Sequence, residues 1–408
     1  MSIRFDRRTL FRMGTASAWS LMALSRAAQA EPRPADRRVL VCVFMRGAVD
    51  GLSMVVPYAE PSYYRDRSSI AIQRPGKGDG AALDLDGRFA LNPRLAALLP
   101  IYRAKELAVV HAVGLPTGTR SHFDAQDEME IAGPDVHTAA EGWLSRALGE
   151  LPRGGLERSI ALGDHVPRAL SGTSGALLVR NLEGFDLHGP GRMRDAMHRG
   201  FERLYGESRD ALGQGGRDAL YATRMLQALD PKSYQPKNGA NYPDKYKHLR
   251  DAAQLIKSNL DVQVVWLDAG GWDTHAGQGG ADGSLGKKLE ELGRALAAFR
   301  ADLDADFGRV TLVTMTEFGR TVAENGTGGT DHGHGSLMMV MGGAVNGGQV
   351  AGRWPGLEPE QRFEERDLAV TTDYRDVLGE VSTHCLGVSN FTHTFPGYTP
   401  NFLGVVRS

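Results

Sequence analysis

Cysteine is scarce in this sequence, with only Cys42 and Cys385 among 408 residues. Two thiols exclude a disulfide-stapled scaffold and a cysteine-based zinc or iron–sulfur site. Whether the two pair with each other stays open, because Cys42 lies in a strongly apolar segment where a cysteine also serves as a small buried hydrophobe. Any metal in this protein must therefore be held by side chains other than thiolates.

The sequence also lacks a long apolar run and an excess of either charge. The weakly apolar stretch from Gly14 to Leu24 is about half of the roughly 20 residues that cross a bilayer, and Arg26 follows it. Lys and Arg number 47 against 49 Asp and Glu, which argues against a nucleic-acid or membrane-surface partner. We expect no stable membrane span and no nucleic-acid binding.

The first thirty residues have the pattern of a twin-arginine signal peptide. Arg7-Arg8-Thr9-Leu10-Phe11-Arg12 supplies the arginine pair and an apolar residue, and Ala28-Gln29-Ala30 supplies a small-x-small cleavage site. We predict that residues 1–30 are removed and that the mature chain, 31–408, is periplasmic or secreted. Because this route carries folded proteins, a cofactor can be inserted before export.

Four apolar, β-rich runs predict buried strands, each ending in a short polar, glycine-containing segment. These runs are Val39 to Met45, Leu107 to Val113, Val262 to Leu267 and Val310 to Met315. Helical patterns lie around and between them, at Asn92 to Lys105, Asp218 to Leu229, Tyr246 to Ser258 and Leu285 to Leu303.

The alternation predicts a doubly wound α/β domain with a mostly parallel sheet flanked by helices. Residues from about 150 to 245 lack strong strand patterns and predict a helical insertion or cap. In such sheets ligands bind beyond the carboxyl ends of the strands, so the polar segments after the strands are where we expect chemistry.

The first two strands are followed by Asp50 and by Arg120-Ser121-His122. Asp50 has the position of a metal ligand or of an Asx turn. Ser121 has the position of a helix N-cap, where its hydroxyl would serve as a nucleophile or oxyanion binder, with Arg120 clamping an anion. An ordinary cap with His122 facing solvent is the alternative.

The third and fourth strands are followed by acids and imidazoles in glycine-rich loops: Asp273, His275, Glu317, Asp331, His332 and His334. Carboxylate and imidazole ligands without thiolate fit divalent Zn, Mn, Ca or Fe. A structural turn with histidines facing solvent is the alternative, because Gly-Gly-Thr-Asp is also good turn chemistry.

These segments together resemble a known family, the exported twin-arginine-signal proteins of the domain-of-unknown-function 1501 family, distant members of the alkaline phosphatase and sulfatase superfamily. The resemblance rests on the segments 46–52, 120–123, 271–275, 317–321 and 329–335. It implies a parallel sheet with metal ions held by Asp and His at strand ends. By position Asp50 matches the first-strand metal aspartate, and Ser121 or a nearby threonine matches the nucleophile. Glu317 stands where Asp-His-Gly is common, a departure from the pattern.

Two functions follow as hypotheses. The first is a metal-dependent hydrolase of phosphate or sulfate esters, or a related transferase, acting on a small-molecule or polymer substrate. Ser121, Arg120 and His122 would be its catalytic residues, and the acids and imidazoles named above its metal ligands. The second is a non-catalytic, metal-stabilised exported protein that binds a surface polymer or a co-exported partner protein. A redox role is left only to bound iron or copper, since the chain has no dinucleotide fingerprint after a strand.

Overall fold

The computed structural model describes residues 37–134, 136–152, 155–172, 175–185, 191–206 and 208–407. The expected signal peptide, residues 1–30, lies outside these ranges, and its cleavage and export stay predictions. Within the described ranges no helix combines the length and the apolar character needed to cross a bilayer.

A nine-stranded sheet forms the centre of the described chain, in the order β11-β5-β10-β9-β1-β8-β6-β7, with β12 also paired to β5. Its strands are β1 Val39–Arg46, β5 Leu107–Gly114, β6 Ser159–Leu162, β7 Leu177–Val179, β8 Val264–Gly270, β9 Val310–Met315, β10 Ser336–Gly342, β11 Val350–Ala351 and β12 Thr372–Asp373. Strand β1 pairs in parallel with both β8 and β9, whereas β10 runs antiparallel between β9 and β5. The sheet is therefore mostly parallel.

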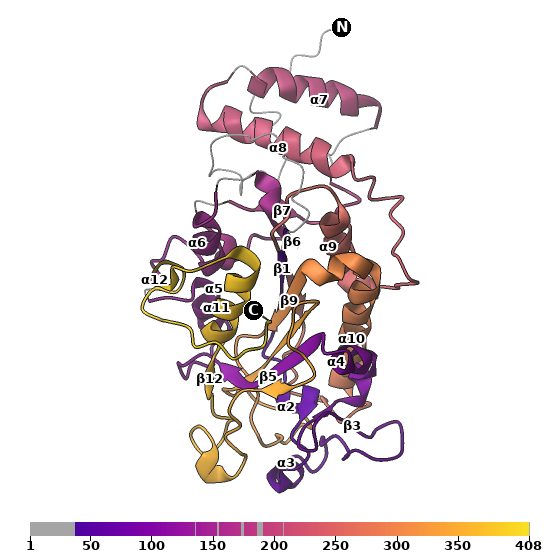
Figure 1. Ribbon diagram of the computed structural model, residues 1–408, viewed down its shortest axis with the longest axis vertical. Coiled ribbons are helices and arrows are strands. Elements are labelled where there is room, and N and C mark those ends of the chain that lie inside the picture. The colour runs from indigo at the N-terminus through magenta and orange to yellow at the C-terminus, as the bar shows by residue number, and fades with distance from the viewer. Residues whose placement is uncertain are drawn as a thin grey trace.

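Helices cover both faces of this sheet (Figure 1). They are α5 His122–Ile131, α6 Trp143–Gly149, α9 Lys247–Lys257, α10 Ser284–Leu303 and α11 Tyr374–Leu386. Alternate side chains of β1 enter opposite cores. Val41 and Val43 pack with α9 and α10, and Cys42 and Phe44 pack with α5, α6 and α11. This alternation makes β1 apolar throughout, as the sequence predicted, and the expected α/β fold is confirmed.

The remaining elements connect or extend this sandwich. The helices are α2 Gly51–Met54, α3 Pro61–Asp66, α4 Leu99–Arg103, α7 Gly191–Gly206, α8 Ala211–Gln227 and α12 Phe391–Thr394. The 3₁₀ turns are η2 Pro93–Leu98, η3 Leu156–Arg158, η4 Arg168–Leu170, η5 Asp244–Tyr246, η6 Asp304–Arg309 and η7 Pro359–Gln361. A small antiparallel sheet, β2-β4-β3, is built from Val55–Val56, Ala90–Leu91 and Leu83–Asp84.

The four predicted strands and the amphipathic helix Leu285 to Leu303 are present, and the whole apolar stripe of that helix is buried. The predicted helix Asn92 to Lys105 divides into η2 and α4, where Pro100 lacks the N–H that a continuous helix needs. Strand β10 was not predicted. It is buried along its whole length between two neighbours, although its Ser-Leu-Met-Met-Val-Met sequence has little β-branched character.

The region from about 150 to 245 is only partly the helical insertion that we expected. Helices α7 and α8 form a pair at one end of the molecule (Figure 1), but the short strands β6 and β7 extend the main sheet beside β8. Their four and three residues are too few to give a clear alternation pattern.

Both cysteines are buried and free. Burial raises the pKa of each thiol, that of Cys385 to about 12. Each therefore acts as a small apolar side chain in the core shared by β1 and α11.

Candidate metal centre

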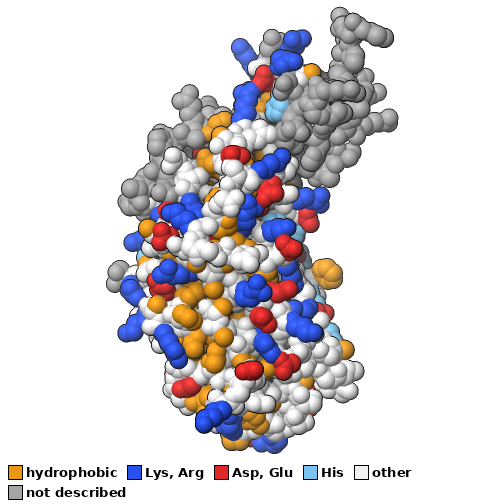
Figure 2. All heavy atoms as spheres, turned by 90° about the vertical axis from the view of Figure 1, so that its right-hand side faces the viewer, with side chains coloured by type: hydrophobic (Ala, Val, Ile, Leu, Met, Phe, Trp, Pro, Cys, Tyr) orange, Lys and Arg blue, Asp and Glu red, His pale blue; other side chains and the backbone are white. Residues whose placement is uncertain are grey.

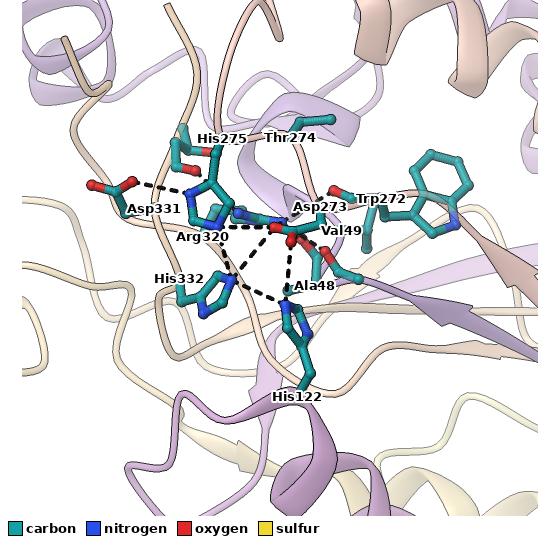
Figure 3. Close-up of polar contacts among 12 residues, drawn as sticks. Ala48, Val49, His122, Trp272, Asp273, Thr274, His275, Arg320, Asp331 and His332 are labelled. Atoms are coloured by element: carbon teal, nitrogen blue, oxygen red, sulfur yellow. Dashed lines mark hydrogen bonds and ion pairs between the residues drawn. The ribbon is translucent and has the colours of Figure 1, made fainter. Parts of the chain in front are cut away.

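Side chains from three segments meet at one edge of the main sheet (Figure 3). His122 begins α5 after β5, Asp273 and His275 follow β8, and His332 precedes β10. Strands β5, β8 and β9 point the same way, and β10 starts at the same edge because it runs antiparallel to β9. The topology therefore gathers residues that lie up to 210 positions apart in the chain.

The three imidazoles present their Nε2 atoms to one another and to a carboxylate. Nε2 of His332 lies 3.0 Å from Nε2 of His122 and 2.9 Å from Nε2 of His275. The carboxylate of Asp273 lies 3.0 Å from Nε2 of His275 and 3.6 Å from Nε2 of His122. The ligand atoms of His122, Asp273 and His332 all lie within 4.8 Å of one another, which is the spacing of groups that share one ion.

The opposite nitrogen of each ring is held by an acceptor. Nδ1 of His122 lies 2.8 Å from Glu317, Nδ1 of His275 lies 3.1 Å from Asp331, and Nδ1 of His332 lies 3.0 Å from the carbonyl oxygen of Arg120. Carboxylates and carbonyls only accept, so each Nδ1 carries the hydrogen. In the neutral rings every Nε2 then carries a lone pair, so the three rings and the carboxylate together can accept a cation or a proton between them.

Glu317 lies behind the His122 ring, on its Nδ1 side, whereas we expected it to bind metal directly. Its side chain is fully buried, and its Oε1 accepts from Nδ1 of His122, from the Gly47 N–H at 2.8 Å and from Gln126 at 2.9 Å. Burial raises the pKa of Glu317, but these bonds, led by that from His122, bring it below its usual range. The same bond raises the pKa of His122. A buried carboxylate behind a histidine is a common arrangement for fixing the ring in metal sites.

Asp331 is placed in the same way behind His275, farther from the centre and more exposed. Its Oδ1 accepts from His275 and from Asn325 at 3.0 Å. These bonds bring the pKa of Asp331 below its usual range, with that from Asn325 the larger. We expected Asp331 to bind metal directly, but it lies on the Nδ1 side of the His275 ring.

Arg320 fixes Asp273, a role that its place in the segment 317–321 did not predict. Its guanidinium is fully buried, contacts Oδ1 of Asp273 and donates to the carbonyl oxygens of Gly47 and Ala48 at 2.7 Å. Burial alone would raise the pKa of Asp273, but Arg320 lowers it. Gly47 has a φ of +114°, and a Cβ there would lie 2.7 Å from the Asp273 nitrogen. Only glycine lets these loops approach so closely.

Asp50, which we expected to bind metal, is not part of this group. It is fully buried, and its two oxygens accept from Arg67 at 2.7 and 3.0 Å and from Gln278 at 2.6 Å. Gln278 in turn accepts from Thr274 at 2.8 Å and from Thr330 at 2.7 Å. The sequence gives no signal for Arg67 or Gln278, because nothing in spacing pairs them with Asp50. Their network joins the loop of Asp273 and His275 to the loop of His332.

The other predicted residues lie around the centre with partners of their own. Ser121 is the N-cap of α5, accepting from the Asp124 N–H at 3.4 Å. The guanidinium of Arg120 binds Asp367 and Glu364 at 2.7 and 2.6 Å. His334 is buried and stacks on Phe363, and burial lowers its pKa to about 4. Ser121 and Arg120 lie near His122 because the three residues are consecutive in the sequence. His334 is not part of the imidazole group.

The centre is open to solvent. Side chains of Asp273 and His275 are 44% and 45% exposed, and those of His122 and His332 are 23% and 24% exposed. Three imidazoles and one carboxylate without thiolate suit Zn or Fe better than Ca or Mg, which prefer oxygen ligands. Solvent access is typical of a site that keeps a coordination position free.

A family model matches residues 108–378 of this chain, and its description is "Protein of unknown function (DUF1501)". No curated protein matches the chain.

Among solved structures, PsFucS1 sulfatase from Pseudoalteromonas sp. is 11% identical with a TM-score of 0.39, and the alignment covers 93% of this chain and 78% of the sulfatase. Ps i-CgsB, solved in complex with k-i-k-neocarrahexaose, is 10% identical with a TM-score of 0.38, covering 88% and 74%. Thermus thermophilus alkaline phosphatase is 14% identical with a TM-score of 0.26, covering 78% and 64%. Similarities this low do not carry an activity from one protein to another.

Proposed function

The chain belongs to the family described as protein of unknown function DUF1501, and from that premise we propose that it is an exported, metal-dependent hydrolase of phosphate or sulfate esters. One observation carries the proposal: the Nε2 atoms of three histidines and the carboxylate of Asp273 lie around one point. Each of the three rings is held in place through its Nδ1. Export rests on the predicted signal peptide alone.

In this proposal His122, His275, His332 and Asp273 hold one divalent metal ion. When bound, such an ion polarises an ester oxygen and lowers the pKa of a coordinated water. Glu317 and Asp331 keep two of the rings in the correct tautomer, and Arg320 keeps Asp273 ionised and directed at the centre. The protein thus holds its donors in place before any ion arrives, which lowers the cost of binding one.

Ser121 remains our proposed nucleophile because it directly precedes His122 at the first turn of α5. Its cap bond to the Asp124 N–H is long, at 3.4 Å, and uses the oxygen as an acceptor, so the hydroxyl hydrogen stays available for transfer. Arg120 would bind a substrate anion only by exchanging Glu364, which is 57% exposed, for that anion.

The first test is metal content and ester turnover of the purified protein. We expect one Zn or Fe per chain after reconstitution, and hydrolysis within a panel of chromogenic phosphate and sulfate esters. Asp273→Ala should remove both metal and turnover, whereas Ser121→Ala should keep the metal and lose the turnover. Lys247→Gln, an exposed change in α9, serves as the control. Correctly folded wild-type protein that takes up no divalent metal would overturn the proposal.

A specific observation favours a second candidate, the non-catalytic exported protein stabilised by one ion. Two of the three predicted catalytic side chains already have partners, Ser121 as a cap and Arg120 with two carboxylates. This candidate predicts bound metal, a lower melting temperature for metal-free protein and no turnover of any ester. Turnover that disappears with Asp273→Ala would exclude it.

A further inference from the structure

Two lysine side chains meet at Gly271, two residues before Asp273. Lys288 of α10 donates to the carbonyl oxygen of Gly271, and Lys245 of η5 lies over the ring of Trp272, 6.0 Å from its centroid. A Cβ built on Gly271 would lie 3.4 Å from Nζ of Lys288 and 3.8 Å from Nζ of Lys245. Both ammonium groups therefore face the same small volume.

Neither ammonium has a carboxylate within 4.0 Å among the described residues. Neighbouring lysines do: Lys247 lies 3.2 Å from Asp244, and Lys257 pairs with Asp302. Burial lowers the pKa of Lys288, and the charge of Lys245 lowers it further, against a smaller opposing effect of Glu291. Two like charges are thus held together without a carboxylate at ion-pair distance, which costs free energy unless an anion joins them.

The surroundings leave room for such an anion. Gly270 and Gly271 are exposed and carry no side chains, while Trp272 is fully buried and donates to the Ala269 carbonyl at 2.7 Å, which fixes the loop. On the face that includes α9 and α10, side chains of both signs are interspersed (Figure 2), and the formal net charge is −2. The lysine pair is therefore a local feature and no part of a broad basic surface.

We propose that Lys245 and Lys288 form a binding subsite for an anionic group of the substrate, a sulfate or phosphate distinct from the one cleaved at the metal centre. The proposal rests on the proposed function and narrows it to esters that carry at least two anionic groups. The pair contacts Gly271, which directly follows β8 and belongs to the same loop as Asp273 and His275. One substrate molecule can therefore reach both sites.

Binding of alkane disulfonates tests the subsite, because these compounds neither hydrolyse nor chelate metal. Ethane-, butane- and hexane-disulfonate are compared with methanesulfonate by calorimetry at low salt, using the metal-loaded full chain. We expect at least one disulfonate to bind wild type about tenfold more tightly than methanesulfonate does. The double variant Lys245→Gln/Lys288→Gln should lose that tenfold advantage and keep its metal content and melting temperature.

The matched control is Lys247→Gln/Lys287→Gln, which removes the same net charge at positions one and two residues away in the sequence. Loss of the advantage in this control as well would assign it to overall charge and overturn the subsite. Equal affinity of the Lys245/Lys288 double variant and wild type for every disulfonate would also overturn it.

Failure of the subsite is distinguishable from failure of the proposed function. If the wild-type protein hydrolyses esters but the lysine variants bind disulfonates as tightly as wild type, the subsite proposal is wrong and the proposed function stands. If no ester is turned over, the lysine-dependent difference in disulfonate affinity still reports on the subsite by itself.

Discussion

Asp50 and Asp273 occupy the same kind of position, just past the end of a buried parallel strand with glycine nearby, yet their surroundings are opposite. Asp50 is fully buried, and Arg67 and Gln278 use both of its oxygens. Asp273 is 44% exposed and faces imidazole nitrogens that have lone pairs to give. A carboxylate at a strand end becomes structural or metal-binding according to what the rest of the chain places opposite it.

The two centres also depend on each other. We call Asp50, Arg67 and Gln278 the dry centre, and the group of His122, Asp273, His275 and His332 the open centre. Gln278 donates to Asp50 and accepts from Thr274 and Thr330. The dry centre therefore holds both loops that carry Asp273, His275 and His332 of the open centre. We expect the dry centre to contribute stability and position, and the open centre to contribute metal binding. Each prediction below separates these contributions.

The largest effect should come from Asp50→Ala. Removing one partner of a buried ion pair leaves the other charge uncompensated, and here Arg67 would stay fully buried, at a cost of about 3–5 kcal/mol in the free energy of unfolding. Asp273→Ala in metal-free protein should cost less, because its carboxylate is partly exposed and the buried Arg320 keeps its hydrogen bonds to the carbonyl oxygens of Gly47 and Ala48. Urea unfolding of the two metal-free variants measures this contrast. Similar losses for both would remove the distinction between the centres.

Lowering the pH should release metal from the open centre before it reduces the stability that the dry centre contributes. The bond to Glu317 raises the pKa of His122, so protons compete for its Nε2 at a higher pH than for an ordinary histidine. Metal affinity should fall by about tenfold per pH unit for each proton taken up below that pKa. Burial acts to raise the pKa of Asp50, but Arg67 lowers it below its usual range. The stability that Asp50 contributes is therefore present above its unfolded-state pKa of about 3.9 and is lost only as the pH falls through the lower folded value.

Metal content by equilibrium dialysis and melting temperature, followed together from pH 7.5 to pH 5, check this order. In metal-free protein the sign for His122 is reversed. Its raised pKa adds stability that is complete below the unfolded-state value of about 6.5 and is lost as the pH rises through the folded value. Metal release and unfolding at the same pH would contradict the separation.

Glu317→Gln should weaken metal binding by about 10- to 100-fold, the usual effect of removing a group that orients a ligand. Gln126→Ala is the matched control, because it removes one donor to the same oxygen and leaves the carboxylate behind His122. Its effect should be several-fold smaller. A loss for Glu317→Gln as complete as that for Asp273→Ala would return Glu317 to the direct ligands that the sequence suggested.

The sequence predicted the main strands and helices well because the apolar patterns that mark them are local in the sequence. Strands β1 and β9 and helix α10 show their burial in runs and stripes of apolar residues, and strand ends located most of the polar side chains that meet at the centre. Strand β10 and the short β6 and β7 were missed because their patterns are weak or brief.

Roles within the centre could not be predicted, because they depend on which atoms face each other across long separations. Glu317 and His122 lie 195 positions apart, and Gln278 and Asp50 lie 228 apart. A sequence identifies acids and imidazoles that follow strands. It does not say which acid meets a histidine and which meets a guanidinium.

The smallest effect separates the two roles of Ser121. As the N-cap of α5, its replacement by alanine should cost about 1 kcal/mol of stability or less, since caps contribute roughly 0.5–2 kcal/mol and this bond is long, at 3.4 Å. Ser121→Gly should cost only a few tenths of a kcal/mol, because glycine is tolerated at this position. If Ser121 is also the nucleophile, both variants should lose turnover alike while their stabilities differ. If it is only a cap, any loss of activity should follow stability and be smaller for glycine. Parallel melting curves and ester assays of the two variants decide whether the open centre uses this hydroxyl or only its helix.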